Sequence, residues 1–238
     1  MNVAIIPARG GSKRIPQKNI KTFFNKPMIA NSIQAAIESK LFDHIIVSTD
    51  CKSIKRVAQE YGAEVPFERP AELADDFTGT GPVVNHAIDW VQSNIGQIDY
   101  ACCIYPTAPF LLASDLQAAF NALTENLNKS FCFSVVRYAF PVQRALTFNE
   151  KDEITMLFPE ESSTRSQDLA EVFHDAGQFY LGRCQAFLDQ KPTFGADSIP
   201  YFLPRSRALD IDDEEDWLEA ELMYAVQQEK YSRGGASE

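Results

Sequence analysis

The feature that most constrains the fold is a short apolar run at residues 3–6, which ends at Pro7. Uninterrupted runs of this length are typical of strands buried on both faces of a parallel sheet. Similar runs recur at 44–48, 63–67, 100–105, 130–136, 178–181 and 198–203. Helical patterns separate most of them, at 28–37, 52–61, 83–95, 114–127, 183–188 and 214–228. The alternation predicts an α/β fold of three layers, α/β/α, around a mostly parallel sheet whose parallel order resumes at 178–181.

The loop after the first predicted strand combines a glycine pair, Gly10 and Gly11, with Ser12 and several basic residues. Glycines let backbone N–H groups approach an anion closely, and arginine and lysine donate charge-assisted hydrogen bonds to phosphate oxygens. The chain has a net charge of -11, yet no acidic residue precedes Glu38. Because open sheets bind ligands at the carboxyl ends of their strands, the loop predicts a polyphosphate site. A solvated basic face is the alternative interpretation.

The length of 238 residues and the 45% hydrophobic content suit one large α/β domain, expected over residues 1–231. Between 137 and 171 the pattern changes to short alternating segments and a polar run, which predicts an inserted hairpin. Residues 232–238 are expected to form a disordered tail. Ser114 and Gln117 have the spacing of a capping box, and Pro82 suits the first position of a helix.

Composition also narrows the expected partners and location. The chain has no run of 18 apolar residues, so we expect a soluble, cytoplasmic protein without a membrane partner. Its acidic balance argues against a nucleic-acid partner. The five cysteines lack C-x-x-C spacing and favour reduced thiols over disulfides or a zinc site. The G-x-x-x-x-G-K-[ST] and G-x-G-x-x-G patterns are absent, which disfavours an ATPase or a dehydrogenase.

Five segments, spaced over nearly the whole chain, together resemble one family: A-R-G-G-S-K-R-I-P-Q-K-N at 8–19, I-I-V-S-T-D at 45–50, R-P-A-E-L-A at 69–74, Y-P-T-A-P at 105–109 and L-D-I-D-D at 209–213. The chain resembles the sugar-acid cytidylyltransferases, which include the CMP-sialic acid and CMP-pseudaminic acid synthetases. The resemblance implies a Rossmann-like fold of the nucleotide-diphospho-sugar transferase type. It also implies a reaction of CTP with a nonulosonic acid that gives a CMP-sugar and diphosphate, for surface-glycan or flagellin glycosylation.

The resemblance assigns a set of nucleotide-binding residues: Arg9, Gly10, Gly11, Ser12, Lys18, Asn19, Arg69 and Thr80. Arg9 and Lys18 would stabilise the charge on the transferring group and on diphosphate. Asp210 and Asp212 would hold Mg²⁺, since residues two apart on an extended segment point to the same face and carboxylates suit this ion. Asp212 or a metal-bound hydroxide would deprotonate the sugar. The competing interpretation is that the acidic run only opens the last helix.

Two departures from the sialic acid enzymes bear on the sugar. Where those enzymes have L-Q-P-T-S-P this chain has I-Y-P-T-A-P, and D-A-G-Q-F-Y at 175–180 replaces P-N-G-A-I-Y. The pattern looks more like the pseudaminic acid enzymes, whose substrate is a di-N-acylated, 9-deoxy sugar acid. A sialic acid synthetase and a non-catalytic CTP- or CMP-sugar-binding module remain alternatives. The expected sugar-binding residues are Tyr105, Thr107, Arg144, Arg165, Gln178 and Phe179, although Tyr105 and Phe179 also suit core packing.

The inserted hairpin and Asp50 are the remaining predictions. In the resembling synthetases the hairpin mediates a homodimer and reaches the partner's active site, which would place Arg144 and Arg165 near the neighbour's sugar. A simple surface hairpin is the alternative. Asp50 follows the second predicted strand, where either a ligand-facing carboxylate or a helix N-cap is expected.

Overall fold

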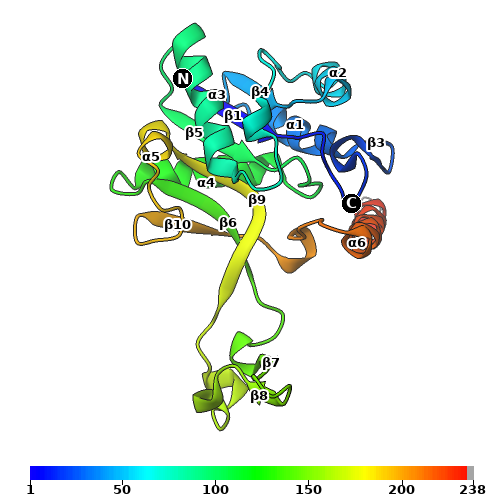
Figure 1. Ribbon diagram of the computed structural model, residues 1–238, viewed down its shortest axis with the longest axis vertical. Helices are drawn as coiled ribbons and strands as arrows, with labels where there is room; N and C mark the ends of the chain where they lie inside the picture. Colours follow the sequence, from blue (N-terminus) through cyan, green and yellow to red (C-terminus); the bar gives the residue numbers. More distant parts are fainter. Residues whose placement is uncertain (235–238) are drawn as a thin grey trace.

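The computed structural model of the protein describes residues 1–234 and is built around a six-stranded sheet (Figure 1). The strands are β1 (Asn2–Pro7), β4 (His44–Ser48), β5 (Tyr100–Ile104), β6 (Phe131–Arg137), β9 (Phe173–Arg183) and β10 (Ser198–Phe202), in the order β10-β6-β9-β5-β1-β4. β1 pairs in parallel with β4 and β5, and β6 pairs in parallel with β10. The mostly parallel sheet predicted from the sequence is confirmed.

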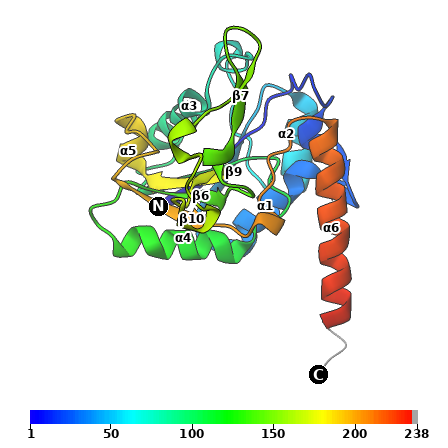
Figure 2. The ribbon, with the colours of Figure 1, turned by 90° about the horizontal axis from the view of Figure 1, so that it is seen from below.

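Helices cover both faces of this sheet (Figure 2). On one face lie α1 (Met28–Ser39), α2 (Lys52–Glu60) and α4 (Ala113–Glu125), and on the other lie α3 (Thr80–Asn94) and α5 (Cys184–Leu188). Alternation along β1 explains the two layers. Ala4 and Ile6 pack with the first group, whereas Val3 and Ile5 pack with the second, all fully buried. The three-layer α/β/α arrangement follows from this alternation.

The orientation of β9 corrects the expectation for 178–181. β9 runs antiparallel to β5 and β6 instead of resuming the parallel order. No α-helix lies between β6 and β9. The chain returns from the inserted segment directly into β9, and strands joined without a helical crossover run antiparallel.

Three local predictions were also wrong. Residues 63–67 form no strand, and only Glu64 bridges to Ile46 of β4. At the start of α4 the backbone N–H of Leu112 donates to Asp115 Oδ2 at 2.9 Å, whereas Gln117 reaches across to the carbonyl of Ser39. Helix α3 begins at Thr80, so Pro82 lies within its first turn instead of opening it.

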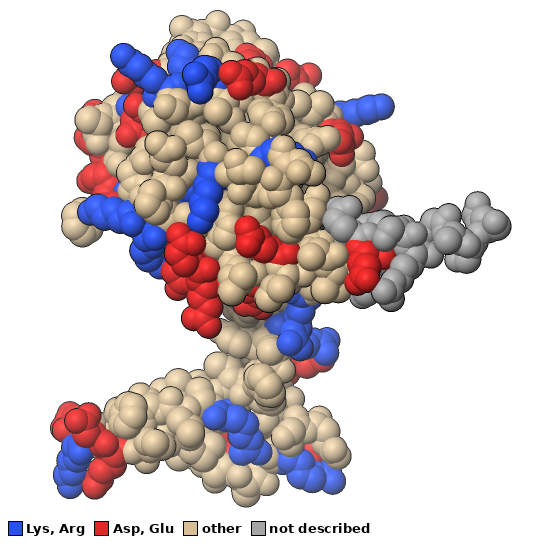
Figure 3. Space-filling model, turned by 90° about the vertical axis from the view of Figure 1, so that its right-hand side faces the viewer, with Lys and Arg blue, Asp and Glu red and all other residues tan. Residues whose placement is uncertain are grey.

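The inserted segment forms a separate lobe. β6 and β9 extend from the body toward β7 (Leu146–Phe148) and β8 (Ile154–Met156), which pair antiparallel, and Figures 1 and 3 show the lobe joined to the body by a narrow neck. Large apolar side chains are exposed on it: Phe140, Leu146, Phe148, Ile154 and Leu157. In Figure 3, charged side chains occupy only part of the visible face of the lobe.

Helix α6 (Glu214–Gly234) packs against the N-terminal loop region. Trp217 and Ala220 of α6 form a buried cluster with Ile15, Phe23 and Ile211. The strands β2 (Thr22–Phe23) and β3 (Lys26–Pro27) form a small hairpin beside it. Short 3-10 helices span Lys18–Ile20, Ala71–Leu73, Val142–Arg144, Pro159–Glu161, Ser166–Asp168 and Arg205–Arg207.

The structure describes only part of the predicted C-terminal tail, residues 232–238. Helix α6 takes in residues 232–234 of the segment expected to be a tail, and residues 235–238 lie outside the described part. Within residues 1–234, none of the helices is both long and apolar enough to cross a membrane.

Candidate active site

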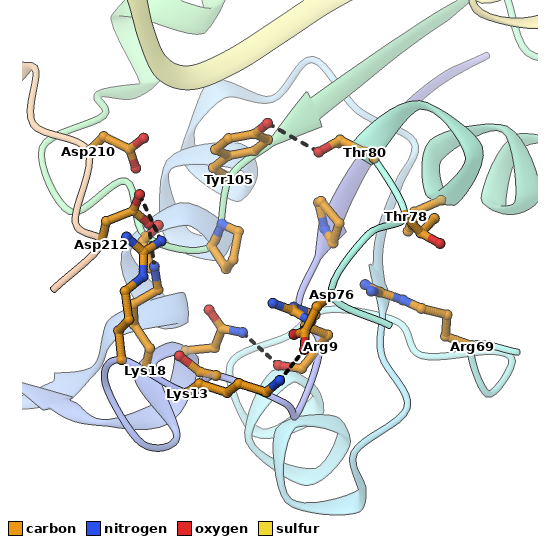
Figure 4. Close-up of a pocket in the computed structure, with 18 residues that line it drawn as sticks. Arg9, Lys13, Lys18, Arg69, Asp76, Thr78, Thr80, Tyr105, Asp210 and Asp212 are labelled. Atoms are coloured by element: carbon orange, nitrogen blue, oxygen red, sulfur yellow. Dashed lines mark hydrogen bonds and ion pairs between the residues drawn. The ribbon is translucent and has the colours of Figure 1, made fainter. Parts of the chain in front are cut away.

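A cavity of about 470 Å³ lies at the carboxyl ends of β1 and β5 (Figure 4). It is lined by residues that are distant in sequence. Among them are most of the predicted nucleotide and metal residues, together with two predicted sugar-binding residues, Tyr105 and Thr107; the nucleotide and metal residues are Arg9, Ser12, Lys18, Asn19, Arg69, Thr80, Asp210 and Asp212. Parallel strands place their carboxyl ends at one edge of a sheet, which explains why the loops that follow them meet here.

The basic loop after β1 is braced by Asp50 and Asn19. The backbone N–H of Gly10 donates to Asp50 Oδ1 at 2.8 Å, and Asn19 Nδ2 donates to the carbonyl of Arg9 at 3.0 Å. A Cβ on Gly10 would lie 2.9 Å from Cys51 Cβ, so only glycine fits here without a shift. The Gly10 N–H is thus engaged by protein, and neither Gly10 nor Gly11 lines the cavity. Asp50 therefore braces the loop, and its side chain does not cap α2.

Two cations of this loop, Arg9 and Lys13, are paired with Asp76, a carboxylate that was not among the residues predicted from the sequence. Arg9 Nη1 lies 2.6 Å from Asp76 Oδ1 and 2.8 Å from the carbonyl of Asp75, and Lys13 Nζ also bonds Asp76. Hydrogen bonds from Lys13 and Arg9 hold the pKa of Asp76 below its usual value. The Asp76 carboxylate therefore occupies a position where Arg9 and Lys13 bind an anion. In the sequence, the adjacent acidic residues Asp75 and Asp76, directly after R-P-A-E-L-A, were the feature that could have predicted this ion pairing.

The Lys18 side chain joins the loop to the L-D-I-D-D segment. Lys18 Nζ donates to the carbonyl of Ile211 at 2.5 Å and lies 3.4 Å from Asp212 Oδ1. Arg14 Nη2 lies 3.0 Å from Asp212 Oδ2. The predicted phosphate-binding loop and the predicted metal ligands thus share one site.

Asp210 and Asp212 face this cavity on either side of Ile211, which is fully buried. Desolvation at the cavity wall and then the neighbouring Asp212 carboxylate raise the pKa of Asp210. Asp213 and Asp216 cap helix α6 reciprocally: Asp213 Oδ1 accepts from the N–H of Asp216, and Asp216 Oδ2 from the N–H of Asp213. Helix capping therefore occupies Asp213 and Asp216 and leaves the Asp210 and Asp212 carboxylates in the cavity.

The donor set at Asp210 and Asp212 fits a magnesium ion. Their hard carboxylate oxygens are the ligand type that Mg²⁺ prefers, and Mg²⁺ is usually held by one or two carboxylates plus phosphates and water. Among the described residues, no group of three or more His, Cys, Asp or Glu forms a complete metal cage. Asp210 and Asp212 are therefore the residues that would hold such an ion.

Arg69 forms a buried part of the cavity wall. It is 5% exposed, and its Nε donates to Ser48 Oγ at 3.1 Å while Nη2 donates to the Ser48 carbonyl at 2.5 Å. Burial lowers its pKa to about 10, with partial compensation from the Asp50 carboxylate, so the guanidinium stays charged at neutral pH. It therefore contributes positive charge to the cavity while its position is fixed by the end of β4.

A second cavity of about 930 Å³ opens beyond Tyr105 and Thr80, which line both cavities. Their hydroxyl oxygens lie 3.1 Å apart (Figure 4). Aromatic and aliphatic side chains form much of the second cavity: Phe131, Tyr180, Phe187, Leu188 and Phe194. These residues were not predicted from the sequence, because apolar side chains at the ends of strands and helices have the same sequence pattern as core residues.

Phe179 and Gln178 lie behind these cavities instead of lining them, which corrects their expected contact with sugar. Phe179 is fully buried in the core and packs beside Tyr201, so its ring has no face left for a ligand. Gln178 is 1% exposed, and its Nε2 donates to the carbonyls of Ala176 and Leu209, both at 3.1 Å. Gln178 supports the segment that carries Asp210.

The two predicted arginines lie on the inserted lobe, and neither lines the two cavities of its own chain. Arg144 donates to the carbonyls of Glu161 at 2.9 Å, of Ser162 at 3.1 Å and of Thr164. Arg165 pairs with Asp168 at 2.7 Å and is largely exposed. The bonds of Arg144 hold the lobe together, whereas the Arg165 guanidinium stands on its surface.

Comparisons with known proteins agree with this arrangement. The sequence model of a family described as Cytidylyltransferase matches residues 3–212. A pseudaminic acid cytidylyltransferase of Campylobacter jejuni (strain 81-176) is 42% identical over 96% of this chain and 98% of its own. An N-acylneuraminate cytidylyltransferase of Escherichia coli O18:K1:H7 is 31% identical over 96% of this chain and 52% of its own.

The fold is also similar to a solved structure of CMP:2-keto-3-deoxy-manno-octonic acid synthetase complexed with CTP. The similarity has a TM-score of 0.66 and covers 95% of this chain and 99% of the other. The two sequences are 14% identical, so this likeness concerns the fold alone.

Proposed function

The chain belongs to the cytidylyltransferase family, and we propose that it transfers the cytidylyl group of CTP to pseudaminic acid, giving CMP-pseudaminic acid and diphosphate. One observation carries the choice of sugar: proteins named pseudaminic acid cytidylyltransferase are 41% and 42% identical over 96% of this chain. The N-acylneuraminate enzyme of E. coli is 31% identical. Tyr105, where sialic acid enzymes have glutamine, supports the same choice.

The triphosphate of CTP lies along the loop after β1 in this proposal. Arg9, Ser12 and Lys18 point into the first cavity, and Arg69 adds charge from its wall. The phosphates displace Asp76, because a triphosphate carries more charge than one carboxylate and binds the same cations. Asn19 keeps the loop in place through the Arg9 carbonyl. Thr80 lies near the ribose.

Transfer takes place where the two cavities meet. The anomeric hydroxyl oxygen of the sugar attacks the α-phosphorus, the bond from this phosphorus to the bridging oxygen breaks, and diphosphate leaves with the bonding electrons. Arg9 and Lys18 stabilise the charge that develops on these oxygens. Asp212, which is paired with Lys18 and Arg14 in the same site, takes the hydroxyl proton.

Asp210 and Asp212 would hold Mg²⁺ together with the phosphates of CTP. When bound, the ion supplies charge neutralisation and Lewis-acid polarisation of a phosphoryl oxygen. The hydrogen bond from Lys18 to the Ile211 carbonyl fixes the backbone between Asp210 and Asp212. It thereby holds the two carboxylates at a constant distance from the cationic loop.

The sugar occupies the second cavity, with Tyr105 and Thr107 near the anomeric end. The apolar side chains of this cavity suit acyl methyl groups and a deoxy terminus, because they offer carbon surface against which such groups can be buried. In a homodimer, Arg165 and Arg144 of the lobe would approach the partner's sugar site. Exposed apolar residues on the lobe support this assembly.

The expected cytoplasmic location stays a prediction.

A protein named post-translational flagellin modification protein B, from Campylobacter coli, is 31% identical over 92% of this chain, which supports the proposed link to flagellin glycosylation.

Diphosphate release tests the proposed function. The purified protein, CTP and MgCl₂ are mixed with pseudaminic acid, with N-acetylneuraminic acid and with no sugar. Release with pseudaminic acid at kcat/KM well above that for N-acetylneuraminic acid is expected. Preference for N-acetylneuraminic acid would favour a sialic acid synthetase, and CTP binding without release with either sugar would indicate a non-catalytic module.

A further inference from the structure

A bulge in β9 brings Asp175 to the mouth of the second cavity. Phe133 of β6 pairs with Tyr180 and Val135 pairs with Asp175, so Ser134 alone stands opposite residues 176–179. Gly177, at φ +60°, makes the turn within the bulge. Ser134 Oγ accepts from the N–H groups of Gln178 and Phe179, at 3.2 and 3.3 Å, and so satisfies the looped backbone. Bulges beside active sites commonly redirect a side chain in this way.

The Asp175 carboxylate is held by two donors within the bulge. The hydroxyl of Tyr180 donates to Oδ2, and the N–H of Gly177 donates to Oδ1 at 3.0 Å. Burial, the nearby Tyr105 and then the bond to Asp175 raise the pKa of Tyr180, so its hydroxyl stays protonated and remains a donor. The Tyr180 ring lies 5.7 Å from that of Tyr105, centroid to centroid. Asp175 is therefore fixed, although its side chain is exposed.

Asp175 and the apolar side chains of the same cavity provide two kinds of contact. An ionised carboxylate only accepts hydrogen bonds, and the N–H of an acylamino group only donates them. Phe187, Leu188 and Phe194 offer apolar surface on which the acyl carbons of the same group can pack. A hydroxyl in place of the acylamino group can still donate to Asp175, but it leaves the apolar surface uncovered.

Building on the proposed function, we propose that Asp175 is a specificity-determining residue that accepts the amide N–H of one acylamino group of the sugar, the one that di-N-acylated pseudaminic acid carries and N-acetylneuraminic acid lacks. Tyr180 acts as its positioning residue. Asp175 and Tyr180 are assigned to the sugar and not to the nucleotide, because both line the second cavity and neither lines the first. Selectivity then depends on a donor and an acyl group presented together, which a hydroxylated sugar chain does not offer.

The test measures sugar selectivity in Asp175→Asn, Tyr180→Phe and the double variant. A hydrogen bond to a charged group contributes enough for Asp175→Asn to raise KM for pseudaminic acid by about 10- to 100-fold. The ratio of kcat/KM for pseudaminic acid to that for N-acetylneuraminic acid should fall by a similar factor, while the Kd for CTP stays unchanged. Tyr180→Phe should cause a smaller fall, and the double variant should fall by less than the product of the two single effects.

Asp197→Asn is the matched control, since this exposed aspartate lies outside both cavities. An unchanged selectivity ratio in Asp175→Asn, or an equal loss for both sugars with weaker CTP binding, would overturn the assignment of Asp175. Tyr180→Phe keeps the ring and gives an independent reading if Asp175→Asn folds poorly. Wild-type protein that releases no diphosphate with either sugar would contradict the proposed function itself, which separates that failure from the failure of Asp175.

Discussion

Lys18 Nζ lies 3.4 Å from Asp212 Oδ1, so a loop that begins nine residues into the chain and a segment near its C-terminus form one site. The buried contact of Ile15 with Ile211 and Trp217 holds these two segments together. Cationic and anionic groups are thereby placed on one wall of the first cavity. This arrangement suits phosphate transfer, in which a cation, basic side chains and a triphosphate must be brought together.

Arg9 and Lys18 are expected to contribute mainly to turnover. Arg9→Ala and Lys18→Ala should each lower kcat/KM by about 100- to 1000-fold, because these donors meet charge that develops during transfer. Lys55→Ala, on the exposed surface of α2, is the control and should keep full activity. Diphosphate release measures the effect, and circular dichroism checks the fold. Near-native turnover in both variants would remove these residues from the mechanism.

The carboxylate pair is expected to determine the magnesium dependence. Asp210→Asn and Asp212→Asn should each reduce turnover by about 100-fold or more and raise the Mg²⁺ concentration for half-maximal rate, with little loss of stability. Glu215→Gln, in the first turn of α6, should behave like the wild type. A magnesium titration of initial rates distinguishes the two groups. Wild-type titration curves for both asparagine variants would limit the acidic run to helix capping.

The two glycines of the loop should respond differently to alanine. A Cβ at Gly10 would lie 2.9 Å from Cys51 Cβ, whereas one at Gly11 would meet only Arg9 Nη1, at 4.0 Å. Overpacking typically costs 1–3 kcal/mol, so Gly10→Ala should raise the Kd for CTP by about tenfold, while Gly11→Ala stays near the wild-type value. Isothermal titration calorimetry measures both. Equal Kd values for the two variants would show that the spacing between the loop and Cys51 does not control binding.

The lobe is expected to form the dimer interface. Phe148 and Ile154 face each other across β7 and β8 and are 66% and 68% exposed. Phe148→Ser should shift the protein toward monomer in light scattering at micromolar concentration, because buried aromatic side chains contribute strongly to interfaces. Leu127→Ser changes an even more exposed apolar side chain on the body and should leave the dimer intact. A wild-type monomer at micromolar concentration would contradict the assembly.

Local sequence patterns predicted the parts of the fold that depend on local packing. The apolar run at 3–6 was sufficient for β1, because alternate residues are buried against helices on both faces. The direction of β9 was not predictable in this way. It depends on how the chain returns from the inserted segment, and the apolar pattern of a central strand is the same in either direction.

The candidate site likewise contains residues that were predicted from the sequence and residues that were not. Charged residues of the basic loop and the aspartates at 210 and 212 were found from their type and spacing, and they line the first cavity. Phe179 was misplaced because an aromatic residue near a site and an aromatic residue in the core have the same sequence signal. Asp175 was missed because its position depends on the β9 bulge, in which Gly177 and Ser134 act together across two strands.

A crystal structure of the protein with CMP-pseudaminic acid would show directly which cavity each part of the product occupies. We expect the cytidylyl group in the first cavity and the sugar in the second, with Tyr105 between them. The phosphate oxygens should lie within hydrogen-bond distance of Arg9 or Lys18, and the acyl groups against Phe187 and Phe194. A sugar bound outside the second cavity, or a phosphate distant from the loop after β1, would contradict this assignment.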